Sequence, residues 1–166
     1  NVSRWLGANG QVPLFPNAKL LVMREEWESA QSLIPWQNQW YCPNGTQGIA
    51  PERLELLDDS VWLGDGAVAL VRTKGHTEGN HSIVAHTDNG LLVTSENGVS
   101  LDAYEPKHSK ISGLADFAKR TGAEVIINGN TQEYVVDQYI SMVQEKSMAG
   151  PNPADERFPN MVPSSE

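Results

Sequence analysis

Histidine is the residue type best suited to chemistry in this sequence, and His76 is the histidine whose surroundings single it out. It lies in Gly75-His76-Thr77-Glu78-Gly79, a segment bounded by glycines. His81 and His86 follow at intervals of five residues, which matches neither the i, i+4 pair of a zinc-binding helix nor one face of a strand. An imidazole in a turn can bind a metal ion or hold the loop by hydrogen bonds, and the sequence allows both roles for His76.

Short apolar runs place this segment at the end of a β-sheet. The runs are residues 67–71, 83–85 and 91–94. Asn89-Gly90 separates the last two and predicts a tight hairpin, and Gly64-Asp65-Gly66 predicts another before the first run. His76 is therefore expected on a loop held by a rigid sheet, which is where binding and catalytic residues are commonly found.

The order of strand, Gly-His-Thr-x-Gly loop, strand, hairpin, strand and acidic residue resembles the metallo-β-lactamase superfamily. The acidic residue after the last strand is Glu96. A second likeness, Phe15-Pro16-Asn17-Ala18 before a strand and then a helix containing Trp27, resembles the lactonase-like branch. The resemblance covers residues 14–148 and implies an α/β fold, the metallo-β-lactamase-like αβ/βα sandwich.

The resemblance also implies a metal centre, with zinc as the expected ion. His76 would be one ligand, and Glu96 would stand where the family has a bridging Asp. Such an ion lowers the pKa of its bound water toward ~7, and the hydroxide attacks a carbonyl. The complete protein is therefore expected to be a zinc-dependent hydrolase of a small ester, lactone or amide.

Four further residues are candidates for supporting roles in that centre. Thr77 and Asn130 would orient ligands or water. Asp102 and His108, in the loop after Glu96, would serve as substitute ligands or as a general base. Plain solvated loop positions are the competing interpretation for Asp102 and His108.

Two departures separate the sequence from active members of the family. Those carry His-x-His-x-Asp-His upstream, and nothing like it precedes His76. Asn130 stands where the family usually has a second histidine, and a neutral amide is a poor zinc ligand. The chain also begins with Asn1 and not Met. We therefore expect only the C-terminal part of the sandwich, incomplete at its N-terminus and inactive alone.

An aromatic cluster marks the segment 33–48. Trp36, Trp40 and Tyr41 lie close together there among Gln, Asn and Pro residues, which predicts a long loop. The rings suit the wall of a substrate pocket, because they give a large contact area at low entropy cost. They equally suit a plug that packs the loop onto the core.

The remaining sequence predicts one domain with a tail. Apolar spacing predicts a helix over 110–121, a buried strand follows at 125–127, and a second helix begins after Thr131. Four prolines after Ala149 break any helix. The predicted organisation is a domain over 1–148 and an extended Pro-rich arm over 149–166.

Composition limits the partners. The net charge of −9 argues against nucleic acid or an anionic membrane as the main partner, and no apolar run approaches the ~20 residues of a membrane helix. The single Cys42 excludes an internal disulfide and a multi-cysteine zinc site. The compartment is not determined, although the cytoplasm is slightly favoured.

Three hypotheses follow, all with a small molecule as the expected ligand. The chain is the C-terminal part of a metal-dependent hydrolase, or a metal-free relative that binds a small molecule or serves assembly. In the third hypothesis a partner chain supplies the missing N-terminal half. A homodimer is a further possibility, because an incomplete sandwich exposes a sheet edge and an apolar face.

Overall fold

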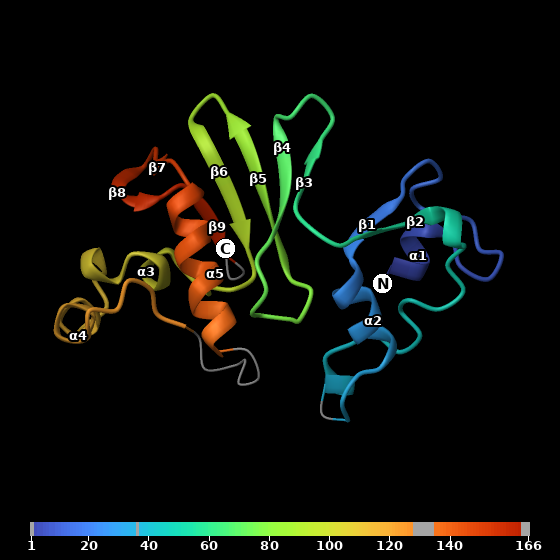
Figure 1. The fold of residues 1–166 in the computed structure, drawn as a ribbon, viewed down its shortest axis with the longest axis horizontal. Helices are drawn as coiled ribbons and strands as arrows, with labels where there is room; N and C mark the ends of the chain where they lie inside the picture. The colour runs from blue at the N-terminus through green and yellow to red at the C-terminus, as the bar shows by residue number, and fades with distance from the viewer. Residues whose placement is uncertain (1, 36, 128–134, 164–166) are drawn as a thin grey trace. The chain divides into compact units, whose positions relative to one another are not determined.

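The computed structural model describes residues 2–35, 37–127 and 135–163. The chain divides into two compact units, residues 1–58 and residues 59–166. Figure 1 labels the helices and strands of both units.

The first unit contains a two-stranded parallel sheet and a helix. β1 (Leu20–Met23) pairs with β2 (Leu54–Leu57), and α2 (Arg24–Gln31) follows β1 directly. Acidic residues occupy the first turn of α2, where the helix dipole favours negative charge. The strand and the helix that the sequence predicts here are confirmed. The short helices of this unit are α1 (Val2–Leu6), η1 (Gln37–Gln39) and η2 (Pro51–Arg53).

The second unit is organised around a five-stranded sheet with the order β3-β4-β5-β6-β9. Its strands are β3 (Val61–Leu63), β4 (Val68–Arg72), β5 (His81–Thr87), β6 (Gly90–Ser95) and β9 (Met161–Pro163). β3 to β6 are antiparallel neighbours, so both predicted hairpins are confirmed. β9 adds to the sheet parallel to β6.

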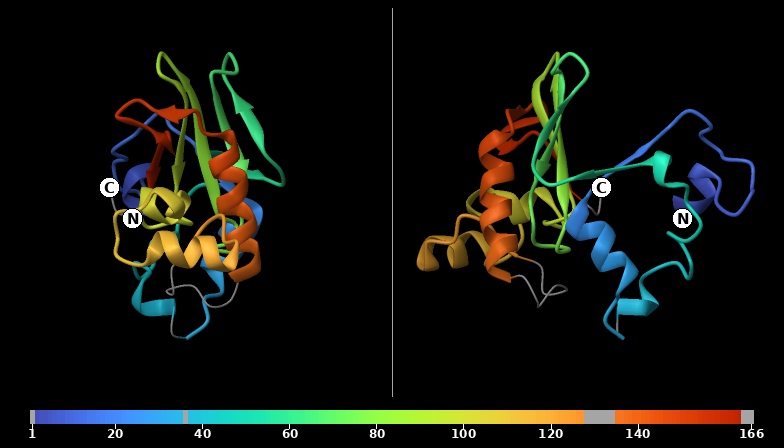
Figure 2. Two further views of the ribbon diagram at one scale, coloured as in Figure 1. Left: turned by 90° about the vertical axis from the view of Figure 1, so that its left-hand side faces the viewer. Right: turned by 45° about the vertical axis from the view of Figure 1, so that its right-hand side comes forward.

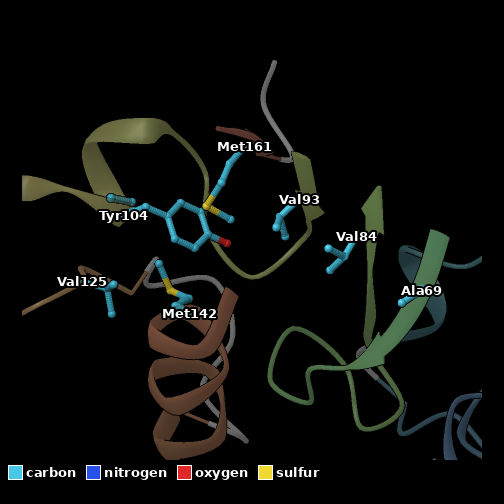
Figure 3. Close-up of a cluster of buried hydrophobic side chains, with 8 residues drawn as sticks. Ala69, Val84, Val93, Tyr104, Val125, Met142 and Met161 are labelled. Atoms are coloured by element: carbon cyan, nitrogen blue, oxygen red, sulfur yellow. The ribbon is translucent and has the colours of Figure 1, made fainter. Parts of the chain in front are cut away.

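One face of this sheet is covered by helix α5 (Val135–Met148), as Figure 2 shows. Ala69, Val84 and Val93 lie side by side on that face because their strands pair in this register. They form one buried cluster with residues of α3, α5 and β9, drawn in Figure 3. The other helices of the second unit are α3 (Leu101–Tyr104), η3 (Pro106–His108) and α4 (Leu114–Thr121).

The segment around Val125 differs from its predicted form. Val125 is buried as expected, but residues 125–127 do not form a strand. The backbone of this segment bonds to α3 instead, through the Ile126 N–H and the Ala103 carbonyl oxygen at 2.8 Å.

The proline-rich C-terminal segment is part of the second unit. The sequence predicts an extended arm over 149–166, and the structure has β7 (Pro151–Asn152), β8 (Asp155–Pro159) and β9 within that range. Pro163 ends the sheet at its edge, which is where a residue without an N–H is tolerated. Among the described residues, no helix is long and apolar enough to cross a membrane.

Candidate functional site

The Gly-His-Thr segment forms a tight loop between β4 and β5. The Thr73 N–H donates to the Asn80 carbonyl oxygen (3.1 Å), and the Gly75 N–H donates to the Thr77 carbonyl oxygen (3.1 Å). The Asn80 side chain donates back to the Thr73 carbonyl oxygen at 2.9 Å. The loop is therefore closed by its own backbone, with the exposed side chain of His76 at its tip.

Asn97 joins this loop to the loop that carries Glu96. Its Oδ1 accepts the His76 N–H at 2.8 Å, and its Nδ2 donates to the Thr73 carbonyl oxygen at 2.9 Å. Asn97 is fully buried, whereas the side chains of His76 and Glu96 are exposed. The structure thus ties together the two loops that the sequence singles out.

Asn97 donates a hydrogen bond to a buried carboxylate on α5, that of Glu145. Glu145 has no exposed surface, and each of its oxygens accepts two hydrogen bonds. Oε1 accepts from Asn97 Nδ2 (2.7 Å) and Ser82 Oγ (2.7 Å). Oε2 accepts from Ser95 Oγ (2.8 Å) and the Tyr104 hydroxyl (2.8 Å). One side chain therefore connects β5, β6, α3 and the Glu96 loop.

The environment of Tyr104 is consistent with this cluster. Burial and the neighbouring negative charge of Glu145 raise the pKa of the Tyr104 phenol well above its usual value. Its hydroxyl also lies 2.5 Å from Ser95 Oγ. Tyr104 is therefore a neutral donor over the whole physiological pH range.

Helix α5 also contacts both loops directly. Gln138 Nε2 donates to the Asn97 carbonyl oxygen (2.6 Å), and Ser141 Oγ donates to the Lys74 carbonyl oxygen (2.5 Å). Gly75 fits because it has no side chain: a Cβ there would lie 2.4 Å from Gln138 Cα and 2.7 Å from Asn97 Oδ1. The glycine of the motif is thus required by the close approach of helix and loop.

The other residues proposed for the site are less closely connected. Thr77 is half-buried and closes the loop through its carbonyl oxygen. Asp102 is half-buried in α3, and His108 is exposed with its ring 6.3 Å from that of Phe158. Asn130 lies outside the described residues. Their proposed roles stay predictions.

A metal ion would need more donors than the described residues bring together. Within residues 2–35, 37–127 and 135–163, no group of three or more His, Cys, Asp or Glu side chains could hold one. A structural or catalytic zinc needs at least three protein ligands. His76 and Glu96 could supply only part of such a set.

The aromatic loop of the first unit lines a pocket of about 810 Å³. Trp40 and Tyr41 are among its lining residues, together with Val22, Trp27 and Leu33. Burial, with a contribution from the charge of Glu26, raises the pKa of the Tyr41 phenol. Trp36 lies outside the described residues. The pocket is large enough for a small molecule.

Sequence reasoning missed the buried polar cluster of Asn97, Glu145 and their hydroxyl partners. A signal for it exists in α5, where Gln138, Met142 and Glu145 follow one another at helical spacing and are all buried. Together with Ser141, three of the four buried residues of α5 are polar. Such a stripe indicates a buried hydrogen-bond network, because buried polar groups require partners.

The mixed α/β structure of the second unit has the predicted order of strand, motif loop, strand, hairpin and strand. This order carries the resemblance to the metallo-β-lactamase superfamily. No family model matches the chain.

A comparison with curated proteins found a similar lactonase. The chain is 28% identical over 113 residues to the N-acyl homoserine lactonase AttM of Rhizobium radiobacter. The match covers 61% of this chain and 41% of AttM, so the chain spans less than half the length of that relative. This similarity confirms the resemblance to the lactonase-like branch of the metallo-β-lactamase superfamily.

Solved structures of similar proteins include two lactone hydrolase complexes. One is an N-acyl homoserine lactone hydrolase with N-hexanoyl-L-homoserine bound at its catalytic metal center (17% identity, 70% of this chain, 48% of that chain, TM-score 0.46). The other is a mutant of B. thuringiensis AiiA with N-decanoyl-L-homoserine bound at the active site (18% identity, 70% of this chain, 48% of that chain, TM-score 0.46).

Proposed function

We propose that this chain is part of a metal-dependent hydrolase that acts on a small ester, lactone or amide, with a lactone as the first substrate to test. The similarity to the lactonase AttM over 113 residues carries the proposal. The Gly-His-Thr loop supports it, because the loop presents the exposed imidazole of His76 while Asn97 holds the His76 backbone by a hydrogen bond.

Zinc is the proposed ion, since imidazole and carboxylate are ligands that it accepts. His76 and Glu96 would contribute to the centre, but the described residues do not form a complete zinc site. We therefore propose that residues beyond the described ones complete the site. The proposed source is an N-terminal half of the sandwich, in the same protein or in a partner chain.

The described residues of this chain are proposed to position the groups of the site. The Asn97 carboxamide holds the backbone of His76, so the imidazole projects from a fixed point. Thr77, Asp102, His108 and Asn130 remain proposed supporting groups. In the first unit, the pocket lined by Trp40 and Tyr41 is proposed to bind the apolar part of a small-molecule ligand.

The experiment begins with the purified 166-residue chain. We expect a zinc-to-protein ratio near zero after dialysis against a weak chelator, and no hydrolysis of N-acyl homoserine lactones, because too few ligands are present. Zinc-dependent turnover by this chain alone, abolished by His76→Ala, would contradict the expectation.

The positive test uses the coding sequence on the N-terminal side of Asn1. Where it contains His-x-His-x-Asp-His, a protein carrying both segments should bind zinc and hydrolyse lactones. His76→Ala should lower kcat/KM by at least about 100-fold, since loss of groups that merely orient ligands already costs 10–100-fold. His86→Ala, on an exposed strand position away from the loop, is the matched control. A longer protein that binds zinc and hydrolyses no lactone, ester or amide would refute the proposal.

A second candidate function is a metal-free domain that binds a small molecule or serves assembly. The observation that favours it is the 810 Å³ pocket in the first unit. Lactone binding that persists without zinc and is weakened by Tyr41→Ala would support this function. Absence of metal and of ligand binding in the longer protein would exclude both functions.

A further inference from the structure

The orientation of the Asn97 carboxamide follows from its partners. The His76 N–H can only donate, so the atom that faces it is Oδ1. The Thr73 carbonyl oxygen and Glu145 Oε1 can only accept here, so the atom that faces them is Nδ2. The amide therefore has one arrangement that satisfies all three partners. Glu145 and the Thr73 carbonyl oxygen therefore together fix the direction in which the amide points toward the His76 backbone.

The hydrogen-bond directions around Glu145 extend this dependence. The Ser82 hydroxyl donates to Oε1, so in its 2.8 Å contact with Thr73 Oγ1 it accepts. The Asn80 amide lies 3.3 Å behind Thr73 Oγ1 and donates to it. A chain of donors thus runs from the far end of the motif loop to the same carboxylate. Thr73 and Asn80, at the two ends of the loop, are thus both linked to Glu145 by hydrogen bonds.

We propose that Glu145 is a positioning residue: acting through Asn97, it determines where the backbone of His76 lies relative to the loop that carries Glu96. Glu145 accepts hydrogen bonds from Ser82, Ser95, Asn97 and Tyr104. It acts through them and is not a catalytic residue. The inference rests on the proposed function in one respect: it treats the loop of His76 and the loop of Glu96 as parts of one site. The positioning itself is a property of the folded chain without metal or substrate.

A reciprocal exchange of amide and carboxylate tests the proposal. Asn97→Asp retains an acceptor for the His76 N–H but places a second carboxylate oxygen against Glu145 Oε1, at the 2.7 Å of the present contact. Two buried like charges at that separation repel. Adding Glu145→Gln restores a donor to the pair, because the new amide can donate to the carboxylate of the N97D variant. In both variants the Thr73 carbonyl oxygen keeps its donor from Asn80 and faces an aspartate oxygen in place of Asn97 Nδ2. The difference between the two variants therefore reports only the partner at position 145.

The measurement is amide hydrogen exchange in the 166-residue chain, followed residue by residue by NMR. The quantity of interest is the exchange rate of the His76 amide, read beside the rate of the slowest core amides, which report global unfolding. We expect N97D to raise the His76 rate at least ten-fold, and N97D/E145Q to lower it again by at least about three-fold. Tyr139→Phe is the matched control on α5, because it removes a hydrogen bond to the Glu124 N–H away from the loop. It should leave the His76 rate unchanged.

The outcomes separate the two proposals. No recovery in the double variant, or an equal rise in Y139F, would overturn the role of Glu145 whatever the enzyme does. If N97D fails to fold, a folded N97D/E145Q protein supports the coupling. If both N97D variants fail to fold while E145Q folds, the coupling is refuted. Because no metal or substrate is present, a failure of the hydrolase proposal leaves these readings unaffected.

Discussion

Replacement of Glu145 is the perturbation whose effect on stability can be worked out most fully from the structure. Glu145→Ala removes the acceptor of four donors, and hydrogen bonds to a charged group contribute about 1.5–3 kcal/mol each. Some donors find other partners: the Tyr104 hydroxyl already lies against Ser95 Oγ, and Asn97 Nδ2 keeps the Thr73 carbonyl oxygen. The expected net loss in the free energy of unfolding is about 3–5 kcal/mol.

Glu145→Gln should cost much less, about 1–2 kcal/mol. The amide can leave its oxygen toward Asn97 and turn its NH₂ group toward Ser95 and Tyr104, whose hydroxyls can accept as well as donate. Gln144→Ala is the control, because Gln144 is the exposed neighbour on the same helix and should change stability by less than about 0.5 kcal/mol.

Urea unfolding followed on amide signals of the second unit is the appropriate assay, because two compact units need not unfold together. The comparison requires equal m-values, so that the change in midpoint reports stability. A loss below about 1 kcal/mol for E145A, or equal losses for E145A and E145Q, would refute the view that the four hydrogen bonds stabilise this unit.

Three further predictions concern single residues. Gly75→Ala should destabilise the second unit by about 2–3 kcal/mol, because the new Cβ would lie 2.4 Å from the backbone of α5; a urea midpoint equal to that of the parent chain would show that the loop can move away. The raised pKa of the Tyr104 phenol means that the unfolded chain loses this proton near pH ~10 while the folded chain keeps it. Stability should therefore fall by up to ~1.4 kcal/mol per pH unit above that point, and less steeply in Tyr104→Phe. The hydrogen bond from Arg157 lowers the pKa of the Asp155 carboxyl to about 2, so the stabilisation from this pair is present above pH 3.8 and is lost as pH falls through 2. Carboxyl carbon NMR should give that value and a higher one in Arg157→Ala, and a pKa unchanged by the substitution would contradict the assignment.

The local elements were predictable because their signals are local. Asn89-Gly90 and Gly64-Asp65-Gly66 need only their neighbours to form hairpins. The form of residues 125–127 was not predictable, since a strand needs a partner from elsewhere in the chain, and here the Ile126 N–H bonds to the Ala103 carbonyl oxygen of α3 instead. The motif located His76 and Glu96. The contact between their loops is made by Asn97, whose buried partner Glu145 lies 48 residues further on in the sequence. No short motif spans that separation.

The hydrogen bonds of Asn97 hold the Gly-His-Thr loop in place, and this affects the free energy of metal binding. Where ligands alone hold the loops of a metal site, the loops lose their order when the ion is removed, and metal binding then includes the cost of ordering them. Here the Gly-His-Thr loop is fixed by a carboxamide, a carboxylate and two hydroxyls of the protein itself. The loop should therefore keep its position without an ion, and the ordering cost should fall on whichever segments supply the remaining ligands. It follows that adding zinc to the 166-residue chain should leave the exchange rate of the His76 amide unchanged, whether or not a longer form of the protein proves to be a hydrolase.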